Sequence, residues 1–247
     1  LTERDGSLPR NSLISKTLVS TDLAKTIADA YGVITVEPHV GFKYIGEKID
    51  LYARAACAAA RADAATCNAP DYRELSRCDR VRLLGRYSLC VLFGGEESYG
   101  SLIGDYVKDK DAVSVTAMFV EMAGFWKKQG RNLLERLEEI GRLYGYAREE
   151  TISISYSGST GSDAIDAIMA DFRHNTPATI AARPVIAALD YRAPGPGKTR
   201  KALRPDGSIV FEDTEPTDPH AHTGYVPAKG IDVPMFWHAD YRIIGAN

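Results

Sequence analysis

The sequence has no large excess of charge of either sign, no long apolar run and no closely spaced pair of cysteines. Its net charge is -3 over 247 residues, which argues against nucleic-acid or anionic membrane partners. No apolar run approaches the roughly 20 residues that a membrane-spanning helix needs. The first residues are polar and charged, unlike a secretory signal. The composition, with 45% hydrophobic and 26% charged residues, is typical of a globular protein with a sizeable core.

The four cysteines give no metal-binding or disulfide pattern. They stand at Cys57, Cys67, Cys78 and Cys90, without a Cys-x-x-Cys pair. A disulfide framework is also unexpected in a chain of this length without a secretory signal. We therefore expect reduced thiols in a cytoplasmic protein.

Two further signals are too incomplete to carry a function. Gly195–Thr199 ends like a phosphate-binding P-loop, but Arg192 stands where the first glycine belongs and two prolines remove amide donors. His220, His222 and His238 lack the defined spacing of a metal site, so solvated loop histidines are the preferred interpretation.

The pattern of apolar residues predicts an α/β domain over residues 1–148. A strand, a capped helix and a second strand within about 30 residues form a βαβ unit, which implies parallel pairing. A helical pair, one helix starting at Asp111 and the next at Asn132, is expected to pack on the sheet. The predicted strands are 12–19, 33–37 and 89–93. The first predicted helix is capped by Ser20 or Thr21 and ends at Tyr31, and the others are 55–65, 112–128 and 133–144.

The composition changes near residue 150, and a smaller α+β domain is predicted over residues 149–247. Thr151–Tyr156 alternates between polar and apolar residues, as a half-buried strand does. Ser162 can cap a helix. Further strands are expected at 184–191, 208–211 and 241–244. We place the domain boundary between Tyr146 and Thr151.

The motif with the clearest chemical content is Gly-Gly-Glu-Glu-Ser-Tyr-Gly at Gly94–Gly100, directly after a predicted buried strand. Ligands of α/β proteins bind at the carboxyl edge of the sheet. In an extended loop, Glu96 and Ser98 fall on one side and Glu97 on the other. A carboxylate such as Glu96 can accept hydrogen bonds from two neighbouring sugar hydroxyls. The residues alone leave open an acidic surface turn without a ligand.

Three motifs in a fixed order carry a resemblance to a known family. A Gly-Phe-Lys motif begins the segment Gly41–Ile49, the Gly-Glu-Glu-Ser motif lies in Gly94–Gly100, and Lys-Asp precedes a long helix in Asp109–Val113. This order resembles the third domain of the phosphohexomutases, the phosphoglucomutase/phosphomannomutase superfamily. The likeness covers most of residues 8–150 and continues more weakly through Gly161–Arg173 into the fourth domain. It is strongest to the branch with bifunctional and phosphopentomutase-like members.

The resemblance implies a fold and a set of substrate-binding residues. The fold is α/β, with a mixed, largely parallel sheet flanked by helices, followed by the smaller α+β domain. Glu96 and Ser98 would hold the sugar hydroxyls, and Lys43 would reach the sugar or its phosphate. Gly95 and Gly41 belong to the same two substrate-binding motifs. The preference among glucose, mannose and pentose phosphates stays open.

Three catalytic motifs of the family are absent from the sequence. They are Thr-x-Ser-His-Asn-Pro, Asp-Gly-Asp-x-Asp-Arg and Arg-x-Ser-Gly-Thr-Glu-Pro; His174–Pro177 and Ser157–Thr160 only imitate parts of them. The resemblance implies transfer of a phosphoryl group through a phosphoserine with Mg²⁺. Together with the cut-looking ends, it predicts the C-terminal part of a longer mutase. Such a chain would contact a hexose phosphate and the N-terminal domains, with catalytic residues and Mg²⁺ outside it, and would be inactive alone.

Two other functions are compatible with the residues. The first is a non-catalytic module that binds a sugar phosphate or regulates a partner. The second is an interaction domain that uses the arginine-bearing insertion at Leu51–Ser88, which departs from the shorter family pattern. The sequence does not reveal the purpose of that insertion.

Overall fold

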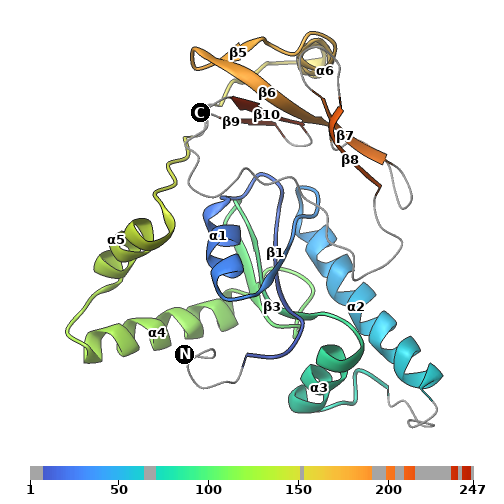
Figure 1. The fold of residues 1–247 in the computed structure, drawn as a ribbon, viewed down its shortest axis with the longest axis vertical. Helices are drawn as coiled ribbons and strands as arrows, with labels where there is room; N and C mark the ends of the chain where they lie inside the picture. Colours follow the sequence, from blue (N-terminus) through green and yellow to red (C-terminus); the bar gives the residue numbers. More distant parts are fainter. Residues whose placement is uncertain are drawn as a thin grey trace. The chain divides into compact units, whose positions relative to one another are not determined.

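The computed structural model describes residues 8–63, 71–150, 153–190, 199–203, 209–214, 235–238 and 241–245 (Figure 1). These residues form two compact units, one up to Ala147 and the other from Arg148 onward. The assignment of the units to two domains of the phosphohexomutase family stays a prediction.

The first unit is built on a sheet with the strand order β2-β1-β3-β4. Three strands run parallel: β1 (Ser12–Lys16), β2 (Ile34–Val36) and β3 (Cys90–Glu96). The fourth strand, β4 (Gly100–Ile103), pairs with β3 in the antiparallel direction. The predicted βαβ unit and largely parallel sheet are therefore confirmed.

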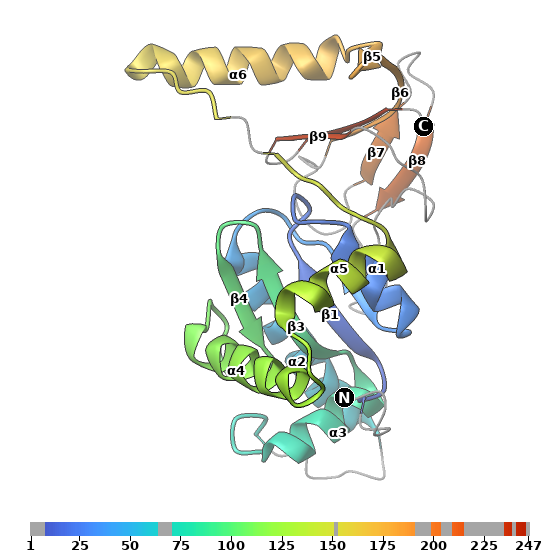
Figure 2. The same cartoon turned by 90° about the vertical axis from the view of Figure 1, so that its left-hand side faces the viewer.

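Helices cover both faces of this sheet. Figures 1 and 2 show α1 (Leu23–Ala30) on one face and α2 (Phe42–Ala62) on the other. This placement follows from the strand order, because the two right-handed crossovers, from β1 to β2 and from β2 to β3, run in opposite directions along the sheet and so put their helices on opposite faces. A third helix, α3 (Arg77–Tyr87), packs beside α2. The main core lies between these two helices and the sheet; its largest aliphatic and aromatic members are Leu13, Phe42, Ile45, Ile49, Tyr52, Leu84, Leu89, Val91 and Leu102.

Helix α2 begins 13 residues earlier than the alanine-rich segment predicted, at Phe42 instead of Ala55. Its first half has no alanine run, but it carries Phe42, Ile45, Ile49 and Tyr52 in the core. These residues recur at helical spacing and face the sheet, so tertiary burial determines where this helix starts.

The helical pair after the sheet consists of α4 (Ala112–Lys128) and α5 (Leu133–Tyr144). The predicted caps are confirmed: Asp111 accepts from Val113 and Ser114, and Asn132 forms a capping box with Glu135. The predicted packing is only partial. Helix α4 contacts β4, yet none of its residues is buried, and its apolar stripe stays half-exposed.

The second unit combines one helix with antiparallel strands. Helix α6 (Ser159–His174) precedes strands that pair in the order β8-β7-β6-β10-β9, with β5 beside β6. Met169 of α6 packs with Val185 and Ala188 of β6. The strands are β5 (Thr179–Ile180), β6 (Arg183–Asp190), β7 (Thr199–Leu203), β8 (Ile209–Thr214), β9 (Met235–His238) and β10 (Tyr241–Gly245).

The α+β class predicted for this unit is confirmed, but one predicted strand is wrong. Ser153–Tyr156 is not in a strand, while Thr151 and Ile152 lie outside the described residues. Its alternating pattern is compatible with an extended connection, and the structure gives it no partner strand among the described residues.

The cysteines that the structure describes are free. Cys57 is half-buried, Cys78 is exposed and Cys90 is buried in the core, while Cys67 lies outside the described residues. Burial raises the pKa of the Cys90 thiol to about 11, so this thiol stays protonated near neutral pH. Among the described helices, none combines the length and the hydropathy required to cross a bilayer.

Two helical glycines should respond in opposite ways to the same substitution. A Cβ on Gly46 of α2 would lie 2.3 Å from the backbone carbonyl oxygen of Lys108, whereas a Cβ on Gly124 of α4 would meet nothing within 4 Å. We expect Gly46→Ala to lower the free energy of unfolding by about 2 kcal/mol or more, because backbone must move. Gly124→Ala should raise it by about 0.5–1 kcal/mol through helix propensity.

Urea denaturation of both variants and the unaltered chain measures these differences. A Gly46→Ala variant as stable as the Gly124→Ala variant would contradict the close approach of α2 to the Lys108 backbone.

Candidate functional site

The strand order creates a reversal between β1 and β3. The chain passes from β1 to β2 on one side, then returns to the other side of β1 to form β3. The loops that leave β1 and β3 therefore diverge, and such a switch point is where open α/β sheets bind ligands. The residues at this edge are Thr17 and those following it after β1, and the hairpin that joins β3 to β4.

The Gly94–Gly100 motif forms this hairpin, and half of it is not a loop. Strand β3 continues through Gly94 and Gly95 to Glu96, which pairs with Gly100 of β4. The sequence indicated a loop here because glycine is rare in strands. In the structure, Gly94 and Gly95 pair with β4 and also with Ser15 and Lys16 of β1, so pairing on both sides keeps them in the strand.

The glycines of this hairpin are required by close neighbours. A Cβ on Gly94 would lie 2.8 Å from a methyl carbon of Ile45, so the first turns of α2 lie directly on β3. A Cβ on Gly100 would lie 2.6 Å from the aliphatic stem of Lys110. These contacts bring the start of α2 and the stem of Lys110 against the acidic hairpin.

Glu96 and Lys110 form an ion pair at the end of β3. The Glu96 side chain is only 3% exposed, whereas that of Lys110 is 46% exposed. The Lys110 ammonium also donates to the carbonyl oxygen of Ser98, at 3.4 Å. The long side chain of Lys110 thus covers Glu96, the predicted acceptor for sugar hydroxyls. Ser98 itself is exposed. Sequence reasoning assigned no role to Lys110, although Lys-Asp was one of the family motifs.

The neighbouring carboxylate, Glu97, has a different partner. Its Oε2 accepts a hydrogen bond from the hydroxyl of Thr17 at 2.7 Å. Because Thr17 has a single hydroxyl proton, Ser20, whose hydroxyl lies 2.7 Å away, must donate to Thr17. The Thr17 amide also donates to the carbonyl oxygen of Gly95, at 3.2 Å. Glu97 therefore connects the hairpin to the loop after β1. Glu96 has a separate partner, Lys110.

A buried cluster joins the ends of β1 and β2. The Lys16 side chain is 3% exposed and pairs with Glu37, whose side chain is 5% exposed. The Lys16 ammonium also lies 3.2 Å from Asp22 at the start of α1 and donates to the Ser20 carbonyl oxygen at 3.1 Å. A buried lysine is tolerated only when its charge is matched and its donors are used. Sequence patterns did not indicate this cluster, because the buried pair joins Lys16 to Glu37, 21 positions further along the chain.

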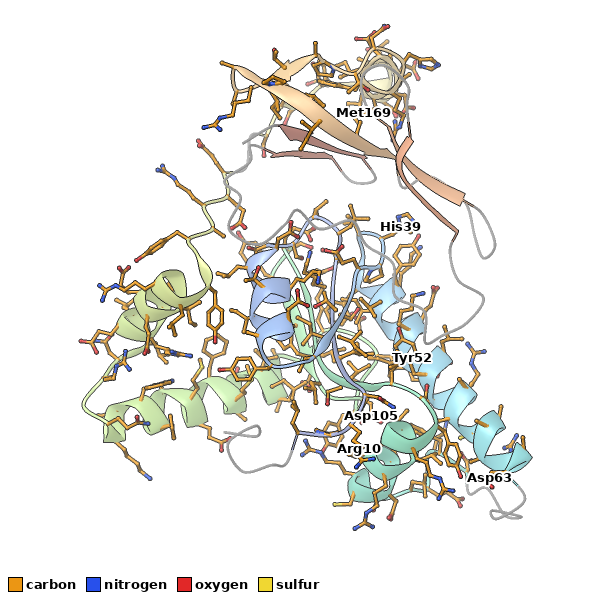
Figure 3. The ribbon with its side chains drawn as sticks, in the orientation of Figure 1. Arg10, His39, Tyr52, Asp63, Asp105 and Met169 are labelled. Atoms are coloured by element: carbon orange, nitrogen blue, oxygen red, sulfur yellow. The ribbon has the colours of Figure 1, made fainter. Side chains whose placement is uncertain are left out.

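Gly41 and Lys43 lie at the start of α2, at the same edge of the sheet. Gly41 has φ +121° and precedes the first helical residue, so Lys43 is in the first helical turn. The Lys43 ammonium lies 4.7 Å from the centre of the Tyr44 ring, which also packs against His39. Figure 3 shows His39 at one end of the sheet and Asp105 at the other.

The arginine-bearing insertion lies around that opposite end. Arg80 pairs with Asp105 at 3.3 Å, and the Tyr72 hydroxyl donates to the same carboxylate at 2.6 Å. Burial is the main cause that raises the pKa of Tyr72, so its phenol stays protonated and can donate. Arg82 and Arg86 pair with Asp79 and Asp63. Internal ion pairs thus occupy these arginines.

Several sequence signals find no described counterpart. Gly195–Lys198, His220 and His222 lie outside the described residues. The part of the chain that the structure describes contains no group of three or more His, Cys, Asp or Glu side chains that could hold a metal ion. The Mg²⁺ that the resemblance implies therefore has no fitting ligand set among these residues.

The fold and this edge define the chain's first unit as an α/β domain with an acidic hairpin at the switch point. Comparison with known proteins supports the same class. A family model described as phosphoglucomutase/phosphomannomutase, alpha/beta/alpha domain III, matches residues 81–144.

Curated relatives extend the match. The chain is 30% identical over 185 residues to a phosphoglucomutase of Staphylococcus haemolyticus, covering 75% of this chain and 28% of that protein. It is 29% identical over 182 residues to a phosphoglucomutase of Staphylococcus aureus, covering 74% of this chain and 27% of that protein. These matches support membership of the chain in the phosphohexomutase superfamily. It spans less than a third of the length of these relatives.

The Lys16 cluster should stabilise the sheet edge strongly. Lys16→Met leaves Glu37 and Asp22 as buried or half-buried carboxylates without their cation. We expect a loss of about 3–5 kcal/mol in the free energy of unfolding. Lys25→Met is the matched control, because Lys25 pairs with Asp29 on the surface of α1 and such pairs contribute about 0.3–0.5 kcal/mol.

Equilibrium urea unfolding of the two variants measures the difference. Adding Glu37→Met to Lys16→Met should recover part of the loss, because one uncompensated carboxylate is removed. Equal stability of the Lys16→Met and Lys25→Met variants would show that the buried pair does not hold this edge.

Proposed function

We propose that this chain is the sugar-recognition part of a phosphosugar mutase that interconverts hexose 1-phosphate and hexose 6-phosphate. The observation that carries the proposal is the Glu96 carboxylate at the end of β3, on the hairpin at the switch point of a phosphohexomutase-type domain. The phosphoglucomutase relatives support a mutase as the activity of the whole protein.

Glu96 and Ser98 bind the hydroxyls of the sugar. The nearly buried Glu96 carboxylate is held by backbone pairing on β3 and is charge-balanced by Lys110. An arriving sugar replaces the Lys110 ammonium at this carboxylate with two neighbouring hydroxyls, and the half-exposed lysine has room to turn aside. Gly95 leaves the backbone beside Glu96 free of a side chain, and the exposed Ser98 adds a hydroxyl.

The start of α2 binds the phosphate of the same substrate. The N-cap residue of this helix is Gly41, which has no side chain to cap the first amides, and no acidic residue lies in the first turn. Backbone amides at a helix N-terminus favour an anion, and Lys43 adds a full positive charge there. Gly41 supports this arrangement, because its φ of +121° turns the chain into the helix without a side chain in the way.

The remaining catalytic parts lie outside this chain. The phosphoserine, the Mg²⁺ ligands and the second phosphate loop belong to other parts of the same polypeptide, including N-terminal domains. When bound there, Mg²⁺ would stabilise the charge of the transferred phosphoryl group. The chain alone is expected to be inactive, and the whole protein is expected to act in the cytoplasm.

A non-catalytic sugar-phosphate-binding or regulatory module is the second candidate. It is favoured by the absence of the three catalytic motifs from these 247 residues. The two functions differ in turnover: a mutase converts its ligand, and a regulatory module only binds it.

The test uses the natural gene product that contains these 247 residues. We expect it to interconvert glucose or mannose 1-phosphate with the 6-phosphate, and Glu96→Ala to lower kcat/KM about a hundredfold or more, because a charge-assisted pair of hydrogen bonds is lost. Glu121→Ala, an exposed position on α4, is the matched control and should leave kcat/KM unchanged.

A coupled assay with each sugar phosphate, including a pentose phosphate, measures the rates. A Glu96→Ala variant with the activity of the Glu121→Ala control would remove Glu96 from the site. Binding without turnover of any of these substrates would establish the non-catalytic module instead.

A further inference from the structure

Tyr99, at the end of the acidic hairpin's turn, has an unfavourable backbone conformation. Its φ is +61°, in the left-handed region that glycine adopts easily and that residues with a Cβ adopt at a steric cost. Asparagine tolerates this region better than most residues, and Asn11 is one of the other described residues found there. An aromatic residue has no such advantage.

The geometry of the hairpin makes the choice of tyrosine more unusual. Glu96 pairs with Gly100, so Glu97, Ser98 and Tyr99 form a three-residue turn. In such turns the third residue takes the left-handed conformation and is usually glycine. The chain has a glycine at the next position, Gly100, where the stem of Lys110 leaves no room for a Cβ. The position that favours glycine by its backbone angle nevertheless carries a tyrosine.

The Tyr99 side chain makes no packing contact that would offset this steric cost in its unit. Its relative exposure is 103%, so the ring packs against none of the described residues. Tyr146 is also strongly exposed, at 69%, but its hydroxyl donates to Glu138 at 2.6 Å. A strained backbone conformation that is not offset by packing of its side chain is typical of functional positions.

We propose that Tyr99 is a further sugar-contacting residue, whose ring covers the nonpolar C–H face of the hexose that Glu96 and Ser98 hold by its hydroxyls. This inference rests on the proposed function. A hexose ring has hydroxyls around its rim and C–H groups on its faces, so recognition needs both polar partners and an apolar surface. An aromatic ring supplies such a surface with few rotatable bonds. Tyr99 follows Ser98 directly and stands on the same rigid hairpin.

Three variants of the natural gene product separate the ring from the backbone strain. Tyr99→Phe keeps the ring, Tyr99→Ala removes the ring and keeps the strain, and Tyr99→Gly removes both. We expect Tyr99→Gly and Tyr99→Ala to raise KM for the hexose phosphate about three- to tenfold, the range of an aromatic contact, and Tyr99→Phe to leave it within about twofold. The unfolding temperature of Tyr99→Gly should lie about 2–4 °C above that of Tyr99→Ala.

Glu96→Gln, measured in parallel, separates this inference from the proposed function. An unchanged KM in Tyr99→Gly together with a raised KM in Glu96→Gln would overturn the role of Tyr99 and leave the sugar site in place. An unchanged KM in both variants would overturn the proposed function as well. A loss of stability in Tyr99→Phe or Tyr99→Gly with unchanged KM would place the ring against another part of the protein, which also contradicts a contact with the sugar.

Discussion

The buried ammonium group of Lys16 is the contact on which the ligand-binding edge depends. It lies where β1 ends and reaches Glu37 beyond β2, Asp22 at the start of α1 and the carbonyl oxygen of Ser20. The next residue, Thr17, connects to Glu97 of the hairpin after β3. One short segment thus joins the ends of all three parallel strands. Since Glu37 lies four residues before Gly41, the same cluster also fixes the entry into α2.

Glycines determine how closely the other parts of the site approach one another. Helix α2 lies against β3 because Gly94 leaves room for Ile45, and it lies against the Lys108 backbone because Gly46 has no side chain. The start of α2, with Lys43, and the end of β3, with Glu96, therefore belong to one rigid edge. A positive helix terminus beside an acidic hairpin is suited to a ligand that has both a phosphate and hydroxyl groups.

Local patterns in the sequence predicted the strands and helices that have a clear apolar periodicity or a capping residue. The βαβ unit, the caps at Asp111 and Asn132 and the α+β class of the second unit agree with the structure. The predicted start of α2 was wrong, because burial of Phe42, Ile45 and Ile49 in the core, and not alanine content, extends that helix. The loop at Gly94 and Gly95 was wrong because strands on both sides override the low strand propensity of glycine.

Only those parts of the candidate site that lie in short sequence motifs could be predicted. Gly-Glu-Glu-Ser and Gly-Phe-Lys identified the hairpin and the start of α2. The pairing of Lys110 with Glu96, of Thr17 with Glu97 and of Lys16 with Glu37 involves residues that are 14 to 80 positions apart. The unfavourable backbone of Tyr99 is likewise a property of the turn and not of its residue type.

The most direct test of the sugar site is a crystal structure of the natural gene product with glucose 1-phosphate bound. Our account predicts two neighbouring ring hydroxyls within about 3 Å of the Glu96 carboxylate, with the Lys110 ammonium displaced from it. A bound sugar that leaves the Glu96–Lys110 pair intact and has no atom within hydrogen-bond distance of residues 94–100 would contradict the account.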